Sequence, residues 1–144
     1  MDGVTGGLFF EDLAIGQDAE RAWTVSEAAI AAFAEVSGDH NPLHLDEAYA
    51  AASPFKGRVA HGMLTAGYVS AVIGGRLPGP GAIYISQTLN FLRPARIGDV
   101  VTVRVKITAL DPAKGCATLA VNALVGRKAM LSGEAVVMVP RRAA

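Results

Sequence analysis

Hydrophobic and polar residues alternate along much of the second half of the chain, as in half-buried β-strands. The alternation is unbroken from Val101 to Thr108, with valines and Ile107 on one side and Thr, Arg and Lys on the other. The segments expected to form strands are residues 82–93, 101–108, 117–125 and 130–139. Turn residues separate the last three of them, at 111–115 and 126–128. The pattern therefore predicts an antiparallel meander.

A different pattern, apolar on all sides, runs from Gly62 to Ile73. A helix of that kind must be buried all round, which in so short a chain predicts a sheet wrapped around it. Apolar residues at helical spacing predict an earlier helix, with Thr24 and Glu27 as a capping box and Gly38 as its end. Two shorter elements are expected as well, a strand over 17–23 and a helix over 46–52.

The order of these elements, a long central helix followed by an antiparallel meander, is that of a hot-dog fold, an α+β architecture. No internal repeat or linker divides the chain, so we expect a single domain over residues 1–144. Hydrophobic residues make up 51% of the chain and charged residues 18%. A small domain with this balance often covers apolar surface by self-association.

The net charge gives no support for nucleic acid or a membrane surface as partner, because thirteen basic and thirteen acidic residues cancel. The uncharged, apolar run from Gly62 to Gly75 is shorter than the ~20 residues of a membrane span. The N-terminus shows no secretory signal pattern, so we expect a cytoplasmic protein. Cys116 is the only cysteine, which excludes an intrachain disulfide and a Cys-based zinc cluster. We expect it to be a small buried hydrophobe.

The residues that suggest chemistry follow the first helix, in the stretch 37–44. Pro42 prevents Asp39 and His44 from lying on one continuous helix and places them at the two ends of a stiff turn. A carboxylate and an imidazole that share one space can move protons through a single water. An ordinary polar turn is the alternative that these residues leave open, because Gly-Asp and Asn-Pro are common turn signals.

This stretch is part of a longer pattern, made of Phe33, Val36, Ser37-Gly38-Asp39, Asn41-Pro42-Leu43-His44 and Ala50. The pattern resembles the signature of the MaoC-like dehydratases and, more narrowly, of the (R)-specific enoyl-CoA hydratases, and every specified position is met. The resemblance continues through 59–63, Pro78-Gly79, 91–94 and Gly98-Asp99, and covers the chain from about Phe10 to Pro140. It implies a hot-dog fold and a homodimer whose two sheets join edge to edge.

The resemblance also implies an activity, the interconversion of trans-2-enoyl-CoA and (R)-3-hydroxyacyl-CoA in fatty acid β-oxidation or in the supply of polyhydroxyalkanoate monomers. Asp39 and His44 would hold one water between them and add it to one face of the enoyl group. The sequence leaves open which of the two is the base, and we prefer His44 as base and Asp39 as proton donor. Asn41 would tie the turn together from behind the catalytic pair.

Further site residues are expected on the long helix. The Gly62 N–H at its N-terminus is suited to hold the thioester oxygen as negative charge develops there. Ser70 resembles a family position that contacts the active site, although it is equally a small packed residue. Ile73, late in the apolar helix, is expected to close the acyl pocket.

Coenzyme A carries phosphates, so Lys56, Arg58 and Arg93 are candidate contacts, although exposed basic residues are more often merely solvated. Of the other histidines, His40 is expected in a solvent or packing role, and His61 to cap or pack the start of the long helix. No histidine pair has zinc-helix spacing, and Asp39 with His44 offers too few ligands, so we expect no metal. No cofactor is expected, because coenzyme A is part of the substrate.

Two other functions are weighed against the hydratase. A hot-dog thioesterase would hydrolyse the acyl-CoA, but such enzymes usually carry an acidic or Asn constellation at the helix start, where this chain has His61-Gly62. A non-catalytic acyl-binding module is the second alternative, and a pure binder has no need for both Asp39 and His44.

Overall fold

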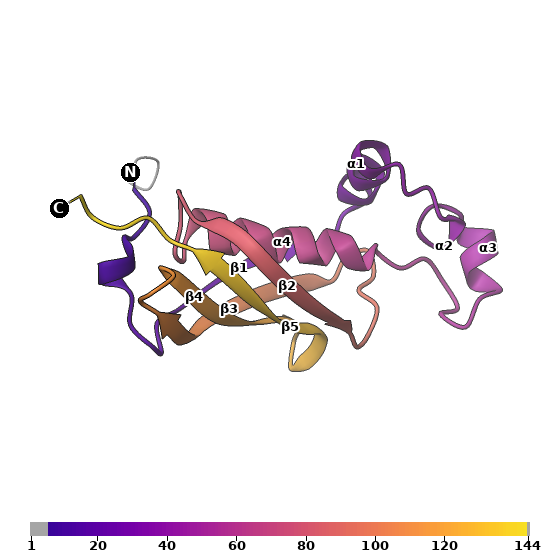
Figure 1. Ribbon diagram of the computed structural model, residues 1–144. Coiled ribbons are helices and arrows are strands. Elements are labelled where there is room, and N and C mark those ends of the chain that lie inside the picture. The colour runs from indigo at the N-terminus through magenta and orange to yellow at the C-terminus, as the bar shows by residue number, and fades with distance from the viewer. Residues whose placement is uncertain (1–5, 144) are drawn as a thin grey trace.

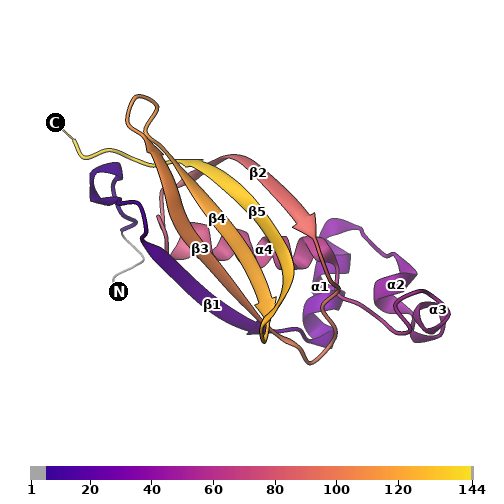
Figure 2. The ribbon, with the colours of Figure 1, turned by 90° about the horizontal axis from the view of Figure 1, so that it is seen from below.

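The computed structural model describes residues 6–143. Its centre is a five-stranded antiparallel sheet in the order β1-β3-β4-β5-β2 (Figures 1 and 2). The strands are β1 (Asp18–Thr24), β2 (Ile83–Phe91), β3 (Val100–Asp111), β4 (Cys116–Val125) and β5 (Lys128–Met138). All five strands were predicted from the sequence, and the hot-dog fold is confirmed.

The sheet packs on the long helix α4 (Gly62–Gly75) through the side chains that the alternation pattern predicted to face inward. On β3, Val101, Val103, Val105 and Ile107 have no exposed surface, while the residues between them are more accessible. The neighbouring strand β4 repeats this alternation with the same phase. In Figure 2, α4 lies lengthwise against one face of the sheet, which is the layering expected of a hot-dog fold.

The helix α4 is buried on one side only, so the expectation of burial all round is wrong for the single chain. Thr65, Val69, Val72 and Ile73 are buried against the sheet. The opposite face is exposed and consists mainly of small residues, namely Gly67, Ser70, Ala71 and Gly74. Because these residues have small side chains or none, they expose little apolar area, and the free-energy cost of exposing this face to water is small.

The first helix, α1 (Glu27–Ser37), is capped differently from the prediction. Ser26 is the N-cap, and its Oγ accepts a hydrogen bond of 3.0 Å from the Ala29 N–H. Thr24, which was expected to cap the helix, is instead the last residue of β1 and pairs with Val100 of β3. The C-terminus is as predicted, since Gly38 adopts a left-handed conformation with φ of 79°.

Two short helices follow, α2 (Pro42–Leu45) and α3 (Glu47–Ala51), each begun by an Asx cap. The Asn41 Oδ1 accepts a hydrogen bond of 3.0 Å from the Leu43 N–H, so Asn41 does tie the turn together. Asp46 caps α3 in the same way. Figure 1 shows α1, α2 and α3 beyond one end of the sheet, with the C-terminal segment and the short 3₁₀ helix η1 (Phe10–Asp12) at the other.

Two further expectations concern the environment of Cys116 and helices that could span a membrane. Cys116 is half-buried at the start of β4 and therefore less enclosed than expected. Within residues 6–143, no helix combines the length and apolar character needed to cross a membrane.

Candidate active site

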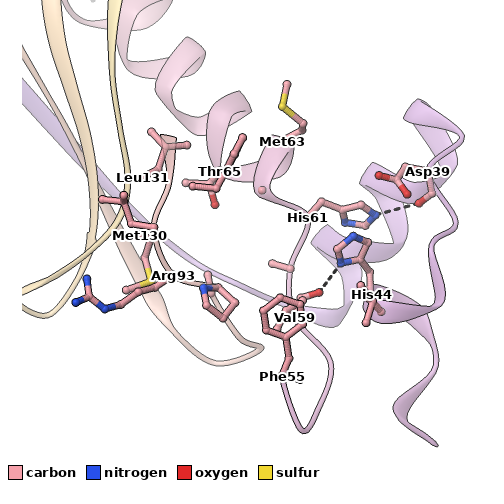
Figure 3. Close-up of a pocket in the computed structure, with 17 residues that line it drawn as sticks. Asp39, His44, Phe55, Val59, His61, Met63, Thr65, Arg93, Met130 and Leu131 are labelled. Carbon is pink, nitrogen blue, oxygen red and sulfur yellow. Dashed lines mark hydrogen bonds between the residues drawn. The ribbon is translucent and has the colours of Figure 1, made fainter. Parts of the chain in front are cut away.

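A cavity of about 380 Å³ lies at the end of the sheet that carries α1 and α2, where the N-terminus of α4 meets the ends of β2 and β5 (Figure 3). Its lining is largely apolar and includes Leu43, Phe55, Val59, Ala60, Met63, Thr65, Phe91, Leu92, Pro94, Ala95, Met130 and Leu131. The ionisable residues that line it are Asp39, His44, His61 and Arg93. The predicted catalytic pair therefore lies beside an apolar space that suits an acyl chain.

Asp39 is held by hydrogen bonds within its own turn. Its N–H donates to the Ser37 Oγ at 3.0 Å, and its Oδ1 accepts from the Asn41 N–H at 3.2 Å. The second carboxylate oxygen has no partner among the described residues and is free to bind water or substrate. The turn therefore sets the direction of the carboxylate before any ligand binds.

The hydrogen bond made by His44 determines which of its ring nitrogens can act as a base. The Nδ1 atom lies 2.7 Å from the main-chain carbonyl oxygen of Val59. A carbonyl oxygen only accepts hydrogen bonds, so Nδ1 must carry a hydrogen. In the neutral ring the Nε2 atom is then unprotonated and offers its lone pair. This is the tautomer that a base needs in order to take a proton from water.

His61 also belongs to the site, which the sequence did not indicate. It is the N-cap residue of α4 but makes no capping hydrogen bond through its side chain, so the expected capping role is wrong and the packing role is confirmed. Its side chain is 1% exposed, and its Nε2 lies 3.0 Å from the main-chain carbonyl oxygen of Asp39. Burial lowers the pKa of His61 below its usual value, which outweighs the opposite effect of that hydrogen bond.

The expectation of no metal counted only two possible ligands, Asp39 and His44, and the structure places His61 beside them. One carboxylate oxygen and one nitrogen from each ring lie within 4.8 Å of one another, which makes three candidate ligands instead of two. The two rings, however, stack with centroids 3.9 Å apart and planes tilted by 30°. Lone pairs lie in the ring planes, so those of stacked rings run side by side and do not converge on one ion. The arrangement favours proton transfer, because a water about 2.8 Å from each of two atoms can bridge such a separation.

Gly62 lies at the edge of this group, at the first position of α4. A Cβ built on Gly62 would come within 2.7 Å of the Phe91 ring, which is closer than a side chain allows. Glycine is therefore needed for Phe91 to pack against the helix N-terminus. The free N–H groups of that first turn adjoin the cavity.

The three basic residues expected near coenzyme A have different surroundings. The Arg58 guanidinium is engaged by both carboxylate oxygens of Glu27, at 2.8 and 2.9 Å, and by the main-chain oxygen of His44 at 2.7 Å. These contacts favour a structural role, in which Arg58 ties α1 to α2. Arg93 lines the cavity and donates to the Ala129 carbonyl, and Lys56 is exposed in the loop after α3.

Ser70 and Ile73 do not line the cavity in this chain. Ser70 lies on the exposed face of α4, and Ile73 is 1% exposed in the core between α4 and the sheet. The acyl-pocket role of Ile73 stays a prediction. The cavity residues that sequence analysis missed, among them Phe55, Thr65 and Met130, come from separate elements and form no local pattern.

Comparison with known proteins places the chain in a family. The family profile described as "MaoC like domain" matches residues 12–126. This protein belongs to the MaoC-like family. The match spans most of the strands, all four α-helices and the Asp39–His44 turn.

Relatives of this MaoC-like protein cover nearly its whole length. It is 51% identical to a 3-hydroxybutyryl-CoA dehydratase of Methylorubrum extorquens, over 94% of this chain and 86% of the relative. It is 52% identical to an (R)-specific enoyl-CoA hydratase of Rhodospirillum rubrum, over 93% of each chain. A solved structure of an (R)-hydratase from Aeromonas caviae involved in PHA biosynthesis superposes with a TM-score of 0.87 at 44% identity, covering 90% of this chain and 99% of that one.

Proposed function

We propose that this MaoC-like protein is an (R)-specific enoyl-CoA hydratase that interconverts trans-2-enoyl-CoA and (R)-3-hydroxyacyl-CoA. The observation that carries the proposal is the Asp39–His44 pair beside the apolar cavity, with His44 locked in the tautomer that leaves Nε2 free. The names of the two relatives described above agree with it, since a 3-hydroxybutyryl-CoA dehydratase and an enoyl-CoA hydratase run one reaction in opposite directions.

In hydration, a water held between the two side chains attacks C3 of the enoyl group. The His44 Nε2 takes one proton from this water, and the remaining hydroxide oxygen forms the C–O bond. The C2=C3 electron pair moves towards the thioester and makes an enolate. Asp39, which enters the cycle as the protonated acid, gives its proton to C2 and becomes a carboxylate. Proton transfer from His44 to this carboxylate then restores both groups. The sum is one water added across one double bond, with both new bonds on one face.

The enolate oxygen needs a hydrogen-bond donor, and the N-terminus of α4 is the candidate. The partial positive charge of a helix N-terminus, about half an elementary charge, favours an anion there. Gly62 is the first residue of the helix, and its N–H has no partner among the described residues. We assign the thioester oxygen to this N–H, which leaves the C–S bond intact.

The reaction written this way uses only protein groups, water and substrate, so it needs no cofactor or metal. The proposed substrate is an acyl-CoA, with Lys56 and Arg93 as the remaining candidates for its phosphates. The role in polyhydroxyalkanoate or fatty acid metabolism rests on the resemblance to the hydratases.

A homodimer is proposed as well, joined along β2. This strand is at an edge of the sheet and leaves large apolar side chains open, with Ile83 54%, Ile85 57% and Phe91 54% exposed. A long apolar edge strand that is left open favours pairing with a strand of another chain. We expect a dimer in sedimentation equilibrium and its weakening in Ile85→Lys, whereas a wild-type monomer would refute the assembly.

The function is tested with crotonyl-CoA, by following loss of the enoyl absorbance, analysing the product on a chiral column and titrating free thiol. We expect (R)-3-hydroxybutyryl-CoA and no thiol. Coenzyme A release without hydration would indicate a thioesterase, and binding without turnover would indicate an acyl-binding module. Formation of the (S) product would contradict the one-faced geometry.

A further inference from the structure

His61 is the one ionisable side chain of the catalytic group to which the proposed mechanism assigns no proton. It lies between two helices that carry catalytic or flanking residues, with its ring centroid 4.7 Å from Phe33 of α1 and 3.9 Å from His44 of α2. Figure 3 shows the His61 and His44 rings side by side, each bonded to a different main-chain carbonyl. Its Nδ1 is buried without a partner among the described residues.

The hydrogen bonds define the state of the ring. The Nε2 faces the carbonyl oxygen of Asp39, so it must be the nitrogen that carries the hydrogen. The ionisable groups that act on His61 are Asp39, His40 and His44, and a positive charge on either of the other two histidines would oppose a charge on His61. Burial acts in the same direction, so His61 is neutral at pH 7.

A neutral ring in this place acts on both catalytic residues. It fixes the main-chain carbonyl of Asp39, whose N–H is already bonded to the Ser37 Oγ, so the residue is held on both sides. It also presents its face to His44, and an aromatic face stabilises a cation stacked on it. His44 becomes such a cation when it takes the proton from water.

We propose that His61 is a positioning residue that aligns Asp39 through its main-chain carbonyl and supports the protonated form of His44 by stacking. The inference rests on the proposed function, and it extends that function by separating two tasks, a hydrogen bond and a ring face. Each task can be removed by itself. His61→Phe keeps a ring and loses the donor, and His61→Gln keeps a donor and loses the ring.

The kinetic test compares these variants with His40→Gln as a control. His40 is exposed, follows Asp39 in the same turn and, among the described residues, contacts only the Gly38 carbonyl through its ring nitrogens. We expect a loss of up to about 10²-fold in kcat for both His61 variants, since small misplacement has that cost, with KM changed much less. In the pH profile of kcat/KM, the limb that depends on His44 should lie at lower pH in His61→Gln than in the wild type. In His61→Phe the same limb should shift by a smaller amount. Unchanged kcat in both folded variants, or an unmoved limb in His61→Gln, would overturn the proposal.

An NMR titration of the ring nitrogens reports the protonation state of each histidine without turnover. We expect His61 to be neutral with hydrogen on Nε2 at pH 7 and to take up a proton only at a lower pH than an exposed histidine. If His61 instead titrates like an exposed histidine, the positioning role is refuted. The proposed function and the positioning role can also fail separately. If the wild type does not hydrate crotonyl-CoA, the proposed function fails. The coupling of the two rings still stands in that case if His61 is neutral and the NMR titration of His44 shifts in His61→Gln.

Discussion

Replacing Gly62 by alanine should reduce catalysis while leaving stability nearly unchanged. The new methyl group would meet Cδ1 and Cε1 of Phe91 at 2.7 Å, so the ring must turn away. Phe91 is 54% exposed, so it forfeits about half of the 1.5–3 kcal/mol that full burial contributes, or about 1 kcal/mol. Alanine is preferred over glycine in a helix interior by up to about 1 kcal/mol, and the part of this preference that applies at the first helical position offsets part of the loss.

The effect on activity has a different origin. The displaced ring and the added methyl group both enter the region of the cavity where the Gly62 N–H would hold the thioester oxygen. Loss of one such donor costs about 10²–10³-fold in turnover, and a donor that is only obstructed should cost about 10–10²-fold. The assay is kcat/KM for crotonyl-CoA, with the midpoint of thermal unfolding measured on the same samples.

Two further variants complete this experiment. Gly75→Ala is the control at the other end of α4, where an added Cβ meets no atom within 4 Å, and it should be fully active. Adding Phe91→Ala to Gly62→Ala removes the collision and should restore part of the lost activity. A folded Gly62→Ala protein with wild-type kcat/KM would show that the thioester oxygen does not bind there.

Three other predictions concern single side chains. Asp39→Asn and His44→Gln should each lower kcat by about 10²–10⁴-fold with the fold retained, and together far less than additively; near-normal turnover in either removes that residue from the mechanism. Ile73→Ala should lower the free energy of unfolding by ~2–5 kcal/mol, and an unchanged preference between octenoyl- and crotonyl-CoA would place Ile73 in the core only. The pKa of His61 is lowered in the folded state, so below pH ~6.5 the unfolded chain binds more protons than the folded one. The free energy of unfolding should therefore decrease as the pH is lowered. Thermal melts should show a smaller fall in His61→Phe, and an identical fall would refute the assigned charge state.

The strand positions were predictable from the sequence because their signal is local. On β3, the alternation of valines with polar residues predicts which side chains face the core, and the structure buries those side chains. Gly38 marked the end of α1 for a similar reason, since a left-handed conformation favours glycine. The Asp39–His44 turn was predictable because Pro42 restricts its own φ and the residue before it.

The tertiary structure decided what depends on contacts between distant segments. Thr24 and Ser26 are both suitable caps, and pairing of β1 with β3 left Ser26 for the helix. His61 lies 22 residues from Asp39 in the sequence, and only the packing of α4 beside the turn brings its ring against His44. The tautomer of His44 was likewise undetermined until folding placed the Val59 carbonyl against Nδ1. Periodicity and turn chemistry act over a few residues, whereas the state of a ring nitrogen depends on whichever atom the folded chain places beside it.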